Sequence, residues 1–178
     1  MSGSEPVRRA DPAGVSGVSG VSGDQDTFKN FGACGSRIAT PSATTLPLQL
    51  AAAPPTTPLR GTDDQPFVQI DTSVRNVSPA ALHVITSKGA LMAITSHGVV
   101  VASPERASRA KGYVYNLEPG ATAAYKSAIY LRSCGAASGT LPPGQYQLHA
   151  LQRFIILVED PIRPMILVPG GPWEIEIG

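Results

Sequence analysis

Three histidines, His83, His97 and His149, are the first candidates for chemistry in this chain. A zinc site or a general base needs an imidazole close to further ligands or to a nucleophile. The three lie on separate predicted strands or turns, and none has a partner at metal-ligand spacing. We therefore expect neither a metal site nor a catalytic histidine.

Serine is abundant, and the Gly-Val-Ser repeat of residues 14–22 invites comparison with the nucleophile elbow of hydrolases. That elbow has the sequence Gly-x-Ser-x-Gly on a turn from a strand to a helix. Here Val18 stands where the second glycine belongs. No phosphate-binding or dinucleotide-binding glycine motif occurs either. We expect no enzyme and no cofactor.

Charged residues give weak signals. Glu174 and Glu176 share one face of a predicted strand, and a solvated outer face explains them better than a cation site. The basic cluster Arg106, Arg109 and Lys111 lacks interleaved aromatic residues on which bases could stack. Because the net charge is only +1, we expect no nucleic-acid partner.

The two cysteines, Cys34 and Cys134, are too few for a structural zinc site with closely spaced ligand pairs. A disulfide is one interpretation. It would close a loop of about 100 residues, for which the chain-entropy model gives about 4.7 kcal/mol. Two buried free thiols in a reducing compartment are the alternative.

Period-two hydrophobicity predicts the elements that must position these residues. A tight turn at residues 96–98 predicts a hairpin, residues 104–112 read as a polar loop, and no amphipathic helix is expected. Some eight strands separated by Gly and Pro predict an all-β, immunoglobulin-like antiparallel β-sandwich. The predicted strands cover residues 46–50, 67–75, 82–86, 90–95, 99–101, 121–133 and 173–177, with a long strand from about residue 146.

Residues 1–27 contain the Gly-Val-Ser repeat and few large side chains. Such a tract cannot offset its ordering entropy, so we predict a flexible N-terminal leader ahead of one domain at residues 28–178. The leader and the sheet edges are expected routes to self-association or to a protein partner.

Four residues are expected to have structural roles: Gly120, Gly144, Tyr146 and Trp173. Gly120 ends a Leu-Glu-Pro-Gly turn, and Gly144 and Tyr146 belong to the Leu-Pro-Pro-Gly-Gln-Tyr corner of residues 141–146. In such a corner the tyrosine can bury its ring while its hydroxyl caps a backbone group. Trp173 begins the closing strand.

These motifs together resemble the immunoglobulin-like domains of actinobacterial secreted or lipid-anchored proteins. The resemblance covers about residues 28–178 and is carried by Cys34-Gly35, Leu117 to Gly120, Ser133-Cys134, Leu141 to Tyr146 and Gly170 to Trp173. A weaker similarity is to the bacterial intracellular proteinase inhibitor family, through residues 74–78 and 141–146.

We expect a non-enzymatic extracytoplasmic protein in a structural or adhesive role, self-assembling into a filament or surface layer. The alternative is a proteinase-inhibitor-like binding module that presents residues 104–112. Met1 to Glu5 show no secretory signal, so a cytoplasmic location stays open. The small polar residues after Met1 resemble the segment that follows the lipidated cysteine of a bacterial lipoprotein, which suggests a lipid anchor in the precursor. No apolar run reaches the roughly 20 residues that span a bilayer.

Overall fold

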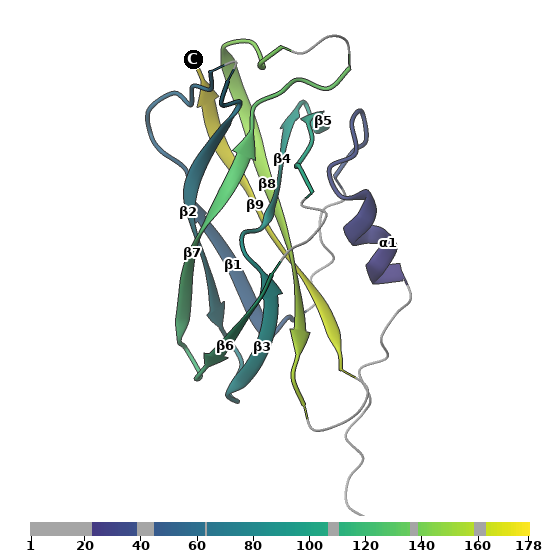
Figure 1. The fold of residues 1–178 in the computed structure, drawn as a ribbon, viewed down its shortest axis with the longest axis vertical. Helices are drawn as coiled ribbons and strands as arrows, with labels where there is room; N and C mark the ends of the chain where they lie inside the picture. The colour runs from purple at the N-terminus through teal and green to yellow at the C-terminus, as the bar shows by residue number, and fades with distance from the viewer. Residues whose placement is uncertain (1–22, 39–44, 63, 107–110, 136–138, 159–162) are drawn as a thin grey trace, which may run out of the picture.

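The computed structural model describes residues 23–38, 45–62, 64–106, 111–135, 139–158 and 163–178. This part of the chain folds into two antiparallel sheets, of three and six strands, so the predicted all-β sandwich is confirmed (Figure 1). Its elements are α1 (Gly23–Asn30), β1 (Leu48–Ala53), β2 (Phe67–Asn76), β3 (Leu82–Ser87), β4 (Leu91–Ser96), β5 (Val99–Ala102), β6 (Gly112–Leu117), β7 (Thr122–Tyr130), β8 (Gly144–Ile156) and β9 (Met165–Ile177).

The smaller sheet has the order β1-β2-β7, and the larger has the order β5-β4-β8-β3-β6, with β9 along the other side of β8. β3 and β4 pair end to end with the same side of β8, at residues 154–156 and 147–151. They are therefore two halves of one long strand that is interrupted at residues 88–90. The predicted hairpin is confirmed, because Ser96 pairs with Val99 across a two-residue turn.

The core lies between the sheets and follows the expected alternation. On β2, Ile70 and Val74 are buried while Gln69 and Asp71 are exposed. Phe154 of β8 is fully buried in the same core. Full burial of side chains of this size is worth about 1.5–3 kcal/mol each.

A buried polar network fills the break between β3 and β4. The side chain of Gln152, 1% exposed, donates hydrogen bonds to Thr86 Oγ1 at 2.9 Å and to the carbonyl of Ser87 at 3.0 Å. Its Oε1 accepts a hydrogen bond from the hydroxyl of Tyr125 in the opposite sheet. Burial, with a smaller contribution from Tyr115, raises the pKa of Tyr125, so this hydroxyl keeps its proton.

A second set of hydrogen bonds secures the other side of the break. Ser127 Oγ of β7 accepts the N–H of Ala90 at 2.9 Å and lies 2.7 Å from Thr72 Oγ1. The two sheets are thus joined by hydrogen bonds as well as by apolar contacts, and these bonds satisfy backbone groups that the interrupted strand leaves unpaired.

No amphipathic helix was expected, and the structure adds a short helix, α1. α1 crosses the predicted boundary between leader and domain at residue 27, and it packs on the outer side of the larger sheet (Figure 1). The Arg106 guanidinium donates to the carbonyls of Phe28 and Phe31, both at 2.8 Å. These bonds satisfy carbonyls that a helix end leaves free, and the Phe28 ring also lies 4.8 Å from the Arg153 guanidinium carbon. Residues 1–22, the rest of the predicted leader, lie outside the described residues.

Three strand assignments also need correction. β9 begins at Met165, eight residues before the strand predicted at residues 173–177. β6 begins at Gly112, inside the predicted polar loop, and no strand was predicted there. β7 ends at Tyr130 rather than at residue 133. Leu131 still donates its N–H to the carbonyl of Pro66, but Pro66 has no N–H to donate in return, and Arg132 forms an isolated bridge with Thr140. Regular pairing with β2 therefore stops at this point.

Candidate functional site

Cys34 and Cys134 are joined by a disulfide whose Cα atoms are 5.5 Å apart, which is the first of the two interpretations of the cysteines. Cys34 follows α1, and Cys134 follows β7. Both segments hydrogen-bond to β5: Gly35 N–H to the carbonyl of Val100, and Cys134 N–H to that of Val101. The bond therefore fastens the helical segment to the sandwich.

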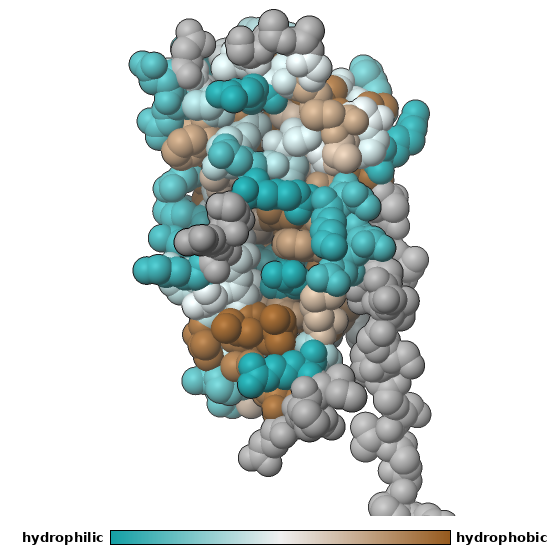
Figure 2. All heavy atoms as spheres, turned by 45° about the vertical axis from the view of Figure 1, so that its right-hand side comes forward, coloured by the Kyte–Doolittle hydropathy of each residue, from teal (hydrophilic) through white to brown (hydrophobic). Residues whose placement is uncertain are grey.

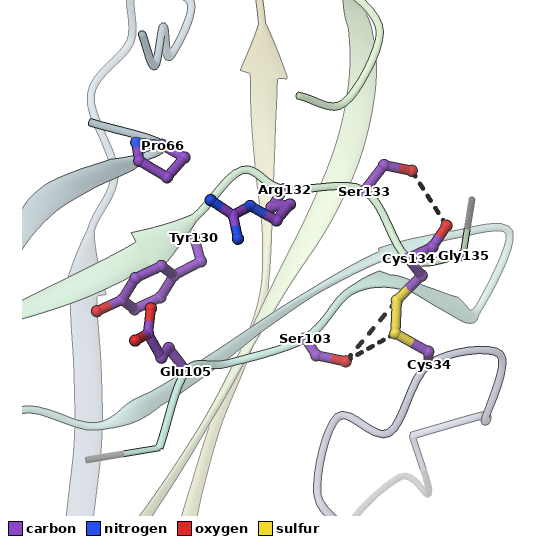
Figure 3. Close-up of a pocket in the computed structure, with 9 residues that line it drawn as sticks. All are labelled: Cys34, Pro66, Ser103, Glu105, Tyr130, Arg132, Ser133, Cys134 and Gly135. Atoms are coloured by element: carbon purple, nitrogen blue, oxygen red, sulfur yellow. Dashed lines mark hydrogen bonds between the residues drawn. A yellow bond between two sulfur atoms is a disulfide. The ribbon is translucent and has the colours of Figure 1, made fainter. Parts of the chain in front are cut away.

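The disulfide borders a shallow depression of about 350 Å³, which is shown in Figure 3. Ser103 lies beside it, with Oγ 3.1 Å from Cys34 Sγ and 3.7 Å from Cys134 Sγ. The same hydroxyl donates a hydrogen bond of 2.6 Å to the carbonyl of Gly32. Its proton therefore points to a backbone carbonyl rather than to a general base, and this geometry favours a structural role for Ser103.

The other wall of the depression carries Glu105, Tyr130 and Arg132. Figure 3 shows the Glu105 carboxylate beside the Tyr130 ring. Partial burial, helped by this negative charge, raises the pKa of Tyr130, so its phenol stays protonated at neutral pH. A disulfide, a phenol, a cation and an anion give this depression a mixed polar surface, suited to polar contacts with another molecule.

The predicted structural residues are distributed over both ends of the sandwich. The hydroxyl of Tyr146 donates to the carbonyl of Pro142 at 2.9 Å, and Gly144 opens β8 just before it. Gly120 donates its N–H to the carbonyl of Asn76 at 2.9 Å in the turn between β6 and β7. Trp173 of β9 packs at the edge of the core. These residues are not brought together in one site.

The histidines are also separate from one another. His97 is at the tip of the β4–β5 hairpin, where it shares a second depression of about 230 Å³ with Glu174. His149 Nε2 lies 3.1 Å from Thr95 Oγ1, and burial lowers the pKa of His149. Among the described residues no three His, Cys, Asp or Glu side chains are grouped so that they could hold a metal ion.

The basic cluster and the polar loop are described only in part, since residues 107–110, including Arg109, lie outside the described residues. Arg106 contacts α1, as stated above, and Lys111 lies directly before β6. The segment expected to contact a protease is residues 104–112. Two of its residues, Arg106 and Gly112, already form contacts within the domain.

Sequence reasoning missed the role of Asn76, which it named only as part of residues 74–78 in the similarity to the proteinase inhibitor family. Asn76 is fully buried, and its Nδ2 donates to the carbonyls of Ala80 and Leu117, both at 2.8 Å. Its Oδ1 accepts from the N–H and the hydroxyl of Ser78. It therefore links the β2–β3 connection to the end of β6, where the chain crosses back to β7. The signal was present in the sequence, because Asn two residues before Ser is typical of an Asx turn.

Comparison with known proteins finds no matching protein-family model and no matching curated protein. Among the described residues, no helix has the length and apolar character needed to cross a membrane.

Proposed function

We propose that this protein is a non-enzymatic extracytoplasmic module with a structural or adhesive role at the cell surface. The disulfide between Cys34 and Cys134 is the observation that carries the proposal. Such bonds persist in oxidising compartments, whereas cytosolic thiols are kept reduced.

Two further features support this function. The covalent link holds a helix outside the sandwich, at the point where the chain enters the domain. The larger sheet has an outer strand, β6, whose free side has no strand paired to it in the described part of the chain. A rigid sandwich with an open edge is suited to binding another protein by strand addition.

The immunoglobulin-like architecture is part of the proposal. Its support is the bond from the Tyr146 hydroxyl to a backbone carbonyl four residues upstream, together with the two stacked antiparallel sheets. Tyrosine corners of this kind are found in immunoglobulin-like sandwiches. An experimental structure compared with that architecture tests this assignment.

Thiol trapping in fractionated cells tests the cellular role. Cells that produce the protein from its natural gene are quenched with acid, and free thiols are alkylated with a maleimide of high mass. We expect the protein in the extracytoplasmic fraction with both cysteines unreactive until a reductant is added. Recovery in the cytosol with both thiols reactive would refute the proposal.

A further inference from the structure

A row of apolar side chains crosses the outer face of the larger sheet. Val114 of β6 pairs with Ile85, Ile85 pairs with Ile155, and Ile155 pairs with Met165 of β9. Directly opposite residues share a face, and this one is the outer face because the neighbouring Val84 belongs to the core. We call these four residues the apolar row. Figure 2 shows the hydrophobic patch at the lower end of this face.

The apolar row ends at an open strand edge. The side chain of Val114 is 53% exposed, and β6 contains neither a charged residue nor a proline. Natural edge strands usually carry one of these features, because each prevents pairing with another chain. β6 therefore lacks the usual protection of an exposed edge.

The backbone of β6 also has groups available for pairing. His83 accepts a hydrogen bond from Leu157 N–H, so His83 and Ile85 direct their backbone groups to β8. The residues between them on β3, such as Val84, direct their backbone groups to β6 and bond to the residues opposite, such as Tyr115. The backbone groups of Val114 and Asn116 on β6 therefore point away from the sheet.

The other outer strands of this sheet are partly covered. Val100 of β5 exchanges backbone hydrogen bonds with Gly35 and Ser36. At the end of β9, Leu59 donates its N–H to the carbonyl of Glu176 at 2.7 Å. Within the described residues, β6 is open along its whole length. β9 is covered only at its C-terminal end, but it carries two prolines and two glutamates, which disfavour pairing with another chain.

We propose that β6 pairs antiparallel with β6 of a second copy of this chain, about a two-fold axis at Val114. The two sheets then form one continuous sheet, and the apolar row of one copy continues into that of the other. This inference rests on the proposed structural role, for which it names the partner and the surface.

The register follows from the outward backbone groups. Val114 of each copy exchanges two hydrogen bonds with Val114 of the other, and Gly112 lies opposite Asn116. At each end of the pair, Lys111 of one copy lies opposite Leu117 of the other, the residue before Glu118. Because successive side chains of a strand point to opposite faces, Lys111 and Glu118 do not meet, and the pair is held by the backbone hydrogen bonds and by the apolar row.

Sedimentation equilibrium on the full chain tests the pairing, with Val114→Lys as the variant and Val77→Lys as the control. Val77 is 49% exposed, close to the 53% of Val114, but lies in the β2–β3 connection outside the apolar row. We expect a dimer whose dissociation constant rises about tenfold or more in Val114→Lys, since two lysines would meet at the axis. Val77→Lys should leave it unchanged. Matching unfolding curves show that both variants fold.

Cross-linking tests the register. In the pair, the Cα atoms of the two Val114 residues are about 5.5 Å apart, within the roughly 4.4–6.8 Å range of disulfides. Val114→Cys should form a covalent dimer on mild oxidation, and Val77→Cys should not. A protein that is monomeric at its highest soluble concentration, or a dimer that is insensitive to Val114→Lys, would overturn the inference. Neither result bears on the thiol-trapping experiment, so the proposed location can be judged separately.

Discussion

Replacing Gln152 by Met should destabilise the fold far more than the loss of one side-chain contact. Methionine has a similar length and is flexible, so it can fill the space without a large cavity. It cannot, however, bond to Thr86, Ser87 or Tyr125, all of which contact the Gln152 amide.

The expected cost follows from which groups lose their only partner. Thr86 Oγ1 keeps its hydrogen bond to the carbonyl of Arg153 at 2.6 Å. The hydroxyl of Tyr125 and the carbonyl of Ser87 lose theirs. An unsatisfied buried polar group costs about 1–3 kcal/mol. Because Ser87 is only partly buried and can reach water, we expect a total of about 2–4 kcal/mol. Domains of this kind have about 5–15 kcal/mol in all.

Urea unfolding with the disulfide intact, followed by Trp173 fluorescence, measures this free energy. Gln69→Met is the matched control, since Gln69 is exposed on β2. Adding Tyr125→Phe to Gln152→Met removes the orphaned hydroxyl, so the double variant should be more stable than the sum of the single changes by about 1 kcal/mol. A Gln152→Met cost within about 0.5 kcal/mol of the control would refute the account of the network.

Three further outcomes are expected. Substituting both Cys34 and Cys134 by Ser should lower the free energy of unfolding by about 4.7 kcal/mol, measured in urea, because the unfolded chain gains loop entropy. Burial lowers the pKa of His149 in the folded protein, so the unfolded protein binds a proton at this ring first as the pH falls. The free energy of unfolding should therefore be highest above about pH 6.5 and decrease below it, and the decrease should be less steep in His149→Gln. Gly171→Ala should cost at least about 1 kcal/mol more than Gly135→Ala in thermal unfolding. Both glycines have positive φ, +85° and +89°, but a Cβ at Gly171 would lie 2.5 Å from a backbone oxygen, whereas one at Gly135 meets nothing within 4 Å.

Each of these outcomes has a clear contrary result. A loss below about 1 kcal/mol in the double serine variant would mean that the helical segment is held without the disulfide. Parallel stability curves for His149→Gln and the unchanged protein between neutral and acidic pH would show that this ring does not titrate differently on folding. Equal costs for the two glycine substitutions would remove the steric argument and leave only the backbone conformation.

The strands of the core were predictable because their signal is local. The alternation of β2 and the turn at residues 96–98 are both visible in short windows of sequence, and both match the structure. β6 was not predicted because most of its side chains are exposed and only Leu117 is buried. It therefore lacks the alternation of hydrophobic and polar residues that predicts a strand. An edge strand of this kind is defined by its neighbour β3 rather than by its own side chains.

The helix and the buried polar residues were missed for a different reason. α1 depends on Arg106, which is more than 70 positions away in the chain, to satisfy its terminal carbonyls. Gln152 and Asn76 are polar residues whose burial is compensated by partners on distant strands. No local pattern records such partners, because they exist only once the sheets are assembled.

The position of the disulfide also determines how the domain responds to mechanical tension. A pulling force applied between α1 and the C-terminus passes from Cys34 straight into Cys134, and strands β1 to β7 lie inside the covalent loop. Only the chain after Cys134 can then extend, to a length of at most about 150 Å, compared with about 500 Å for the chain after Cys34 once the bond is reduced. The disulfide thus limits how far the domain can be stretched, and its reduction would increase the length of chain that can unfold under force.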